Sequence, residues 1–149
     1  MKAIRTWILV ADGARARILE NDGPGRGLHA VEGMTFQADH AATHDLVTER
    51  EGRSYSSQGP GRSAIEARTD PHRDLKTSFS HHLADVLTRA HHNQAYDRLI
   101  IAASPVTLGD LRAAISDKVR ATVSAELARD LTKLPNGELP SHFQDLIAL

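Results

Sequence analysis

The sequence predicts an α/β fold built on a mixed five-stranded sheet. Three observations predict it. Residues 6–11 (TWILVA) are a short apolar run, and residues 97–103 (DRLIIAA) end in another; both are typical of strands buried on both faces. A long amphipathic pattern lies between them, and tight turn signals divide the first third of the chain. With 149 residues, of which 40% are hydrophobic, we expect a single domain over residues 1–149.

The first 36 residues predict three antiparallel strands in a meander. The apolar run at 6–11 ends at Asp12-Gly13, a dipeptide that favours a tight hairpin turn. Residues 14–20 then alternate between apolar and polar side chains, as a second strand would. The sequence NDGPGRG consists largely of residue types that favour turns, and it leads to a third strand over residues 29–36.

A long helix and a fourth strand follow in the second half of the chain. Apolar residues three and four apart predict a helix over Asp74–His92, about five turns long. The strand at 97–103 stops at Ser104-Pro105, and Thr107 with Asp110 resembles a capping box that opens a short helix. We expect Leu83 on the long helix to be buried against Ile8, Val10 and Ile100.

The last 31 residues predict one more strand and one more helix. Apolar residues alternate over 119–127 as in a fifth strand, although 125–134 could also be helical. The sequence PNG breaks the chain, and the apolar residues of 139–147 predict a final amphipathic helix. A three-strand meander followed by helix, strand, helix, strand and helix is the order of ribonuclease H-like folds, with right-handed crossovers.

The candidate functional segment is the one between Thr48 and Asp74. It reads TEREGRSYSSQGPGRSAIEARTDPHRD, without helical or strand periodicity, and a loop of this length in a compact domain is usually functional or disordered. Its arginines can contact phosphates, and its glycines give backbone freedom. The candidates for contact with RNA or the ribosome are Arg50, Arg53, Gln58, Gly59, Gly61, Arg62, Arg68 and Arg73. The alternative is a solvated loop whose arginines pair with its own carboxylates. We expect residues 50–72 to be mobile or ordered only by a partner.

Composition excludes several classes of protein. The net charge of −1 means that nucleic-acid binding would need a local patch, and we expect no DNA binding. The absence of cysteine excludes disulfides and thiolate metal sites. The apolar run near the N-terminus is too short for a signal sequence, and no span approaches the ~20 apolar residues of a membrane helix. We therefore expect a cytoplasmic protein without membrane contact; the sequence makes no prediction of its oligomeric state.

A metal site or a nuclease active site has weaker support in the sequence than a binding role for the 48–74 segment. Asp12 ends the first strand, where ribonuclease H-like nucleases place a metal-binding carboxylate, and only Asp97 and Asp110 could join it. All three are explained as turn or cap residues. His40 and His44 have the i, i+4 spacing of two ligands on one helical face but lack a third ligand at a familiar spacing. We expect no metal.

Nucleophilic and nucleotide chemistry are also weakly supported. The serines of the segment have His72 nearby in sequence, but no Gly-x-Ser-x-Gly motif accompanies them. Gly59-Pro60-Gly61 is too short for a phosphate-binding P-loop. We therefore expect no catalytic residues and no cofactor.

Almost the full length of the chain resembles the bacterial host-attachment family. The resemblance rests on four blocks: WILVADGARARIL (7–19), GRSYSSQGPGRSAIEARTDP (52–71), YDRLIIAASPVTLGDLRAAIS (96–116) and AELARDLTKLPNGELPSHF (125–143). That family in turn resembles the central domain of eukaryotic and archaeal class-one release factors and of Pelota. There, three strands lead to a glycine-rich loop, a long helix and an apolar strand. In release factors the loop carries Gly-Gly-Gln, whereas the corresponding place here reads QGPGRS.

The resemblance implies a non-catalytic, cytoplasmic binding protein that contacts RNA or the ribosome through the 48–74 segment. One alternative is a loop-borne esterase, such as a peptidyl-tRNA hydrolase in which Gln58 orients water. Another is a protein–protein adaptor with an indirect role in attachment to host cells.

Overall fold

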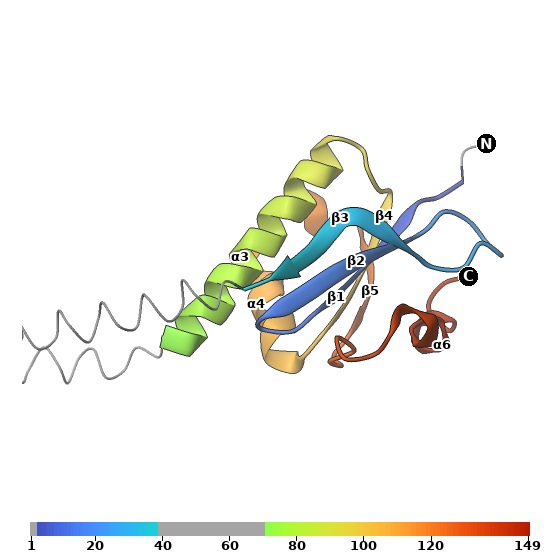
Figure 1. The fold of residues 1–149 in the computed structure, drawn as a ribbon. Helices are drawn as coiled ribbons and strands as arrows, with labels where there is room; N and C mark the ends of the chain where they lie inside the picture. Colours follow the sequence, from blue (N-terminus) through green and yellow to red (C-terminus); the bar gives the residue numbers. More distant parts are fainter. Residues whose placement is uncertain (1–2, 39–70) are drawn as a thin grey trace, which may run out of the picture.

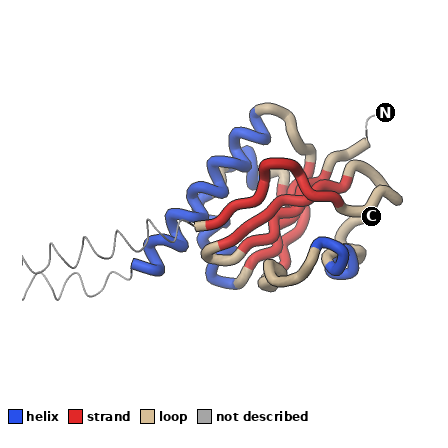
Figure 2. Tube along the Cα trace, in the orientation of Figure 1, coloured by secondary structure: helices blue, strands red, loops and turns tan. Residues whose placement is uncertain are grey.

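The computed structural model describes residues 3–38 and 71–149. They form a five-stranded sheet with helices on one face and an irregular C-terminal segment on the other (Figures 1 and 2). The elements are β1 (Thr6–Ala11), β2 (Arg15–Asn21), β3 (His29–Gln37), α3 (Pro71–His92), β4 (Arg98–Ala103), α4 (Pro105–Ala114), α5 (Asp117–Arg120), β5 (Val123–Leu127), η1 (Asn136–Glu138) and α6 (Pro140–Phe143).

The sheet is mixed, as the sequence predicts. Its strand order is β3-β2-β1-β4-β5; β1 pairs antiparallel with β2 and parallel with β4, and β5 is parallel to β4. The central strands β1 and β4 are buried almost throughout, because they have neighbours on both sides and cover on both faces. The mixed five-stranded sheet is therefore confirmed, while the ribonuclease H-like assignment and the single domain stay predictions.

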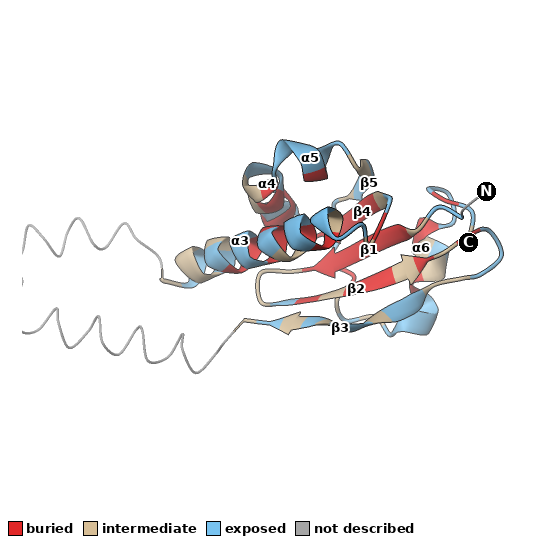
Figure 3. Ribbon diagram, turned by 90° about the horizontal axis from the view of Figure 1, so that it is seen from above, coloured by how far each residue is buried: buried red, intermediate tan, exposed pale blue. Residues whose placement is uncertain are grey.

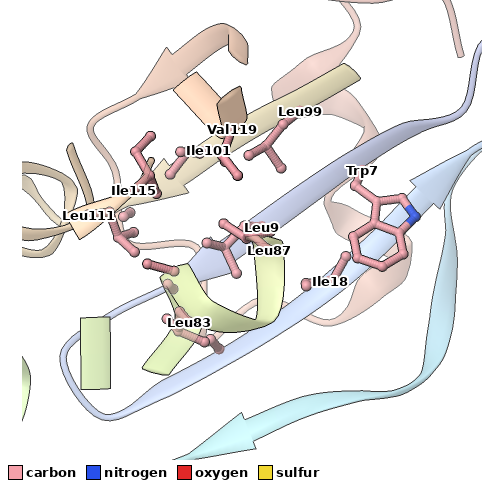
Figure 4. Packing of buried hydrophobic residues seen from close by; sticks show 14 of the residues in the cluster. Trp7, Leu9, Ile18, Leu83, Leu87, Leu99, Ile101, Leu111, Ile115 and Val119 are labelled. Atoms are coloured by element: carbon pink, nitrogen blue, oxygen red, sulfur yellow. The ribbon is translucent and has the colours of Figure 1, made fainter. Parts of the chain in front are cut away.

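Helices α3 and α4 cover one face of the sheet (Figure 3). Leu83 is only 1% exposed and lies in one cluster with Leu9 and Ile101, as Figure 4 shows. The burial of Leu83 is confirmed, but its predicted partners are wrong. Ile8, Val10 and Ile100 belong to the cluster on the opposite face. Successive side chains of a strand point to opposite faces, so neighbouring residues of a strand that is buried on both faces pack into different hydrophobic clusters.

The C-terminal segment covers the second face of the sheet. Its buried side chains are Leu131, Leu139, Phe143 and Ile147. The helix predicted over 139–147 is shorter than expected, since α6 spans only Pro140–Phe143.

A side chain from the sheet holds this irregular segment in place. Arg17 donates from Nε to Asn136 Oδ1 (2.7 Å), from Nη1 to the Thr132 carbonyl (3.0 Å) and from Nη2 to the Leu134 carbonyl. These bonds satisfy carbonyl groups that have no helix or sheet to pair with, which explains why an irregular segment can cover the face.

The predicted fifth strand is present, but its predicted start is wrong. The fifth strand begins at Val123 rather than at residue 119, because α5 comes first, with the Ser116 hydroxyl accepting from the Val119 amide at 3.2 Å. The alternative of a helix over 125–134 is wrong. Residues 125–127 belong to β5, which pairs with β4, and residues 128–134 form turns and irregular backbone.

The predicted capping box of the helix after β4 is wrong. Helix α4 begins at Pro105, with Ser104 at the N-cap and no side-chain cap bond. Proline suits the first helical position because its φ is fixed and its missing N–H is not needed there. Thr107 is buried one turn into the helix, and Asp110 binds Arg73 of α3 instead of capping.

Within residues 3–38 and 71–149, no helix is both long enough and apolar enough to cross a membrane. The predicted mobility of residues 50–72 concerns positions that lie outside the described residues, apart from Pro71 and His72, which begin α3.

Candidate functional site at the base of the long segment

Both ends of the 39–70 segment are attached at the same end of the sheet. Strand β3 leads into the segment and α3 begins directly after it, next to the β1–β2 turn (Figure 1). The Ala38 amide donates to the Ala14 carbonyl at 2.6 Å. A Cβ placed on Gly13 would lie 2.6 Å from Lys76 Cγ, so α3 packs directly on the turn. We call this region, formed by Gly13, Arg15, Ala38, Arg73 and Lys76, the loop base.

Asp12 organises the β1–β2 turn in the loop base. Its Oδ1 accepts from the amides of Ala14 (2.8 Å) and Arg15 (2.7 Å), and its Oδ2 accepts from Thr132 Oγ1 (3.1 Å). Burial opposes ionisation of this carboxylate, but the two amides and the hydroxyl outweigh it, so the pKa of Asp12 lies below its usual value. Asp12 therefore has a complete structural role as a turn residue.

The three carboxylates of the nuclease hypothesis do not converge. Asp12 follows the last residue of β1, whereas Asp97 precedes β4, which runs parallel to β1 in the register Thr6↔Arg98. The two carboxylates are thus at opposite ends of a six-residue strand pair, about 20 Å apart at ~3.3 Å per residue. Asp97 accepts from the Arg5 amide at 2.8 Å, and Asp110 binds Arg73.

Arg73, the one proposed RNA-binding residue that the structure describes, lies in the first turn of α3 rather than in a loop. Its Nη1 and Nη2 donate to the two carboxylate oxygens of Asp110 on α4, at 2.6 and 2.5 Å. The Arg73 side chain is 44% exposed and that of Asp110 13%. This bidentate pair fastens the start of α3 to α4 just where the long segment ends.

The other predicted site residues lie outside the described residues. They are Arg50, Arg53, Gln58, Gly59, Gly61, Arg62 and Arg68, together with the histidines His40 and His44 of the metal hypothesis. Their roles therefore stay predictions.

Cationic side chains nevertheless surround the points where the segment leaves and returns. Arg15, Arg73 and Lys76 are all exposed in the loop base. Two of them have a carboxylate partner, since Arg73 binds Asp110 and Arg15 lies 3.7 Å from Asp12. Sequence reasoning did not find Arg15 and Lys76, because only the fold places the β1–β2 turn beside the start of α3.

The sequence profile of the family described as "protein required for attachment to host cells" matches residues 7–143. The chain belongs to this host-attachment family. The match extends from β1 to the last residue of α6 and includes the whole 48–74 segment. No curated protein matches the chain.

The Arg73–Asp110 pair predicts a pH-dependent contribution to stability. The hydrogen bonds from Arg73 lower the pKa of Asp110 below its usual 3.8, against a smaller opposing effect of burial. A carboxyl whose folded pKa is lowered adds stability above its unfolded pKa and loses it as the pH falls through the folded value. Since Arg73 is partly solvated, we expect Asp110→Asn to cost about 1 kcal/mol at pH 7.

Urea unfolding at pH 7 and at pH 3 and below checks this prediction. The difference between the wild type and Asp110→Asn should shrink toward zero at low pH. Asp117→Asn is the matched control, because the Asp117 side chain is 99% exposed in its pair with Arg120; its effect should stay within about 0.5 kcal/mol. A difference for Asp110→Asn that does not change with pH would contradict the assignment.

Proposed function

We propose that this member of the host-attachment family is a non-catalytic binding protein of the cytoplasm that contacts RNA or the ribosome through the 48–74 segment. The observation that carries the proposal is the loop base. A long segment rich in arginine starts and ends on one rigid end of the sheet, between exposed cations.

The geometry supports presentation of the segment to a large anionic partner. The Ala38–Ala14 bond ties down its start, and the Arg73–Asp110 pair ties down the helix into which it leads. Phosphate contacts position a protein on RNA without reading its sequence, and arginine suits them because its guanidinium binds phosphate with two parallel hydrogen bonds. Arg15 and Lys76 are exposed near the points where the segment begins and ends, with Arg15 3.7 Å from Asp12 in an ion pair. Because the net charge is −1, binding to RNA would rest on the arginines of the segment together with these two cations.

The order of elements also supports the proposal. Three strands, a long segment with Gln58-Gly59-Pro60-Gly61, a long helix and an apolar strand follow one another as in the release-factor domain that the family resembles. Hydrolysis is the weaker reading, because Gly-Gly-Gln is absent and Pro60 removes an amide that could stabilise an oxyanion. A cytoplasmic role in translation would make any effect on attachment to host cells indirect.

Salt-dependent binding to purified ribosomes and to an RNA oligonucleotide tests this function. We expect Arg53→Ala/Arg62→Ala to weaken binding and to lower the slope of log K against log [salt] by about 0.7–0.9 for each lost phosphate contact. The matched control is Arg89→Ala/Arg129→Ala, which removes the same charge from exposed positions on α3 and after β5. It should leave the slope within error of the wild type.

A third variant addresses the esterase alternative. Gln58→Ala should leave ribosome or RNA binding nearly intact. Hydrolysis of peptidyl-tRNA that disappears in Gln58→Ala would replace the binding function by the enzymatic one. Equal salt slopes for the loop and control variants, or no association of the wild type with ribosomes or RNA, would contradict the proposal and favour the adaptor reading.

A further inference from the structure

Three side chains of types that can bind a metal ion lie together at the end of the sheet opposite the loop base. Glu20 lies near the end of β2, Asp22 directly follows that strand, and His29 is the first residue of β3. Glu20 and His29 are cross-strand partners in the register of the two strands. One ligand atom from each of the three residues lies within 4.8 Å of the others.

The Glu20 carboxylate is held in place from inside the core. Trp7 is 3% exposed, and its Nε1 donates to Glu20 Oε1 at 2.9 Å. The Trp7 ring is in turn stacked on Tyr96, with centroids 5.0 Å apart. The second carboxylate oxygen, Oε2, is thereby directed at His29 Nε2, 3.3 Å away. Metal ligands are typically oriented by such a hydrogen bond from a neighbouring residue.

The connection between β2 and β3 holds the other two residues. Asn21 is 2% exposed; its Nδ2 donates to the Gly27 carbonyl at 2.7 Å and its Oδ1 accepts from the Gly23 amide at 3.2 Å. The Gly25 amide donates to the Leu149 carbonyl at 2.8 Å, which ties the loop to the C-terminus. Asp22 and His29 therefore flank a loop with a defined shape.

We propose that Glu20, Asp22 and His29 form a binding site for a divalent transition-metal ion of the zinc class. One imidazole and two carboxylates are a donor set that suits zinc and copper(II) better than calcium or magnesium, which favour oxygen ligands alone. Tetrahedral ligands about 2.1 Å from an ion are about 3.4 Å from one another, close to the 3.3 Å between Glu20 Oε2 and His29 Nε2. A carboxylate oxygen of Asp22 lies within 4.8 Å of both of these atoms and supplies the third ligand when Asp22 turns toward the ion.

The site is open to solvent, so water takes the remaining positions. The side chains of His29 and Glu20 are 50% and 21% exposed. Asp22 also lines an open cavity of about 1490 Å³, together with Arg26, His91 and His92. The ordinary alternative for Glu20 and His29 is a cross-strand ion pair without a metal, and the two differ in whether an ion binds saturably.

Trp7 is the single tryptophan of the chain and bonds one of the proposed ligands, so it reports directly on the site. The experiment uses the untagged full chain, with zinc binding followed by calorimetry and copper(II) binding followed by quenching of Trp7 fluorescence. We expect one saturable site for each ion. His29→Gln and Glu20→Gln should each weaken zinc binding at least about tenfold and remove most of the saturable quenching. Glu20→Gln retains an oxygen that can accept from Trp7.

Matched histidine controls separate this site from the other histidines. His40→Gln/His44→Gln removes the pair with helical ligand spacing, and His91→Gln removes the ring whose centroid lies 5.9 Å from that of Tyr96. Both should leave zinc affinity and quenching unchanged. Thermal unfolding checks folding: zinc should raise the midpoint of the wild type and of both controls, but not that of His29→Gln. No saturable zinc binding by the wild type, unchanged binding by His29→Gln, or loss of binding in either control variant would overturn the proposal.

Discussion

Replacing Phe143 by alanine is expected to lower the free energy of unfolding by about 3–5 kcal/mol. Phe143 is fully buried against the second face of the sheet, in the cluster that contains Ile8, Val10 and Ile100. The cover of this face is an irregular segment whose α-helix, α6, has four residues and ends at Phe143. Truncation of a buried Phe removes more apolar volume than that of a Leu or Val, so the loss should be near the upper part of the range for large-to-small changes.

Urea unfolding followed by circular dichroism measures this loss. The matched control is Leu146→Ala in the same segment, three residues further on, where the side chain is 40% exposed. It should cost less than about 1 kcal/mol. Similar losses for the two variants would mean that the C-terminal segment does not cover the sheet as described.

The second large effect is expected for Leu83→Ala on α3, at about 2–5 kcal/mol. Leu83 is packed into the first-face cluster that includes Leu9, Leu87 and Ile101 (Figure 4). Ile100 and Ile101 are neighbours on β4, are both fully buried and face opposite sides of the sheet. They allow a direct test of which face α3 covers.

Double-mutant cycles with these two isoleucines make that test. Leu83→Ala combined with Ile101→Val should be non-additive by about 0.5 kcal/mol or more, because both changes act on one core. Leu83→Ala combined with Ile100→Val should be additive within about 0.5 kcal/mol. The reverse pattern would place α3 on the face where the sequence had predicted it.

The element types of this protein follow from local patterns. β1 and β4 are predictable because a strand buried on both faces needs an unbroken apolar run, and the long helix because one buried stripe repeats every three or four residues. The order of elements, together with the preference for short connections, was enough to predict a mixed five-stranded sheet. The four sequence blocks likewise indicated the host-attachment family that the match over residues 7–143 shows.

Local patterns do not reveal which face a doubly buried strand presents to which partner. From Trp7 to Ala11, β1 is apolar at every position, so Ile8 and Leu9 are equivalent in the sequence although they belong to different cores. The C-terminal residues have the spacing of a helix, yet the segment is irregular, with Arg17 donating to the Thr132 and Leu134 carbonyls and to the Asn136 side chain. Asp110 looks like a capping residue until the packing of α3 on α4 brings Arg73 to it.

The candidate sites also differ in whether the sequence alone could reveal them. The arginines of the 48–74 segment are a property of the sequence, and its length alone marked it as the place to look for function. The loop base exists only in the folded chain, because the packing of α3 on the sheet brings the start of that helix to the β1–β2 turn. The Glu20–Asp22–His29 group likewise exists only in the folded chain, because the register of β2 and β3 sets Glu20 opposite His29. The sequence by itself determined the elements and their charges; the tertiary structure decided which of them meet, since contacts between distant residues depend on register and packing rather than on spacing along the chain.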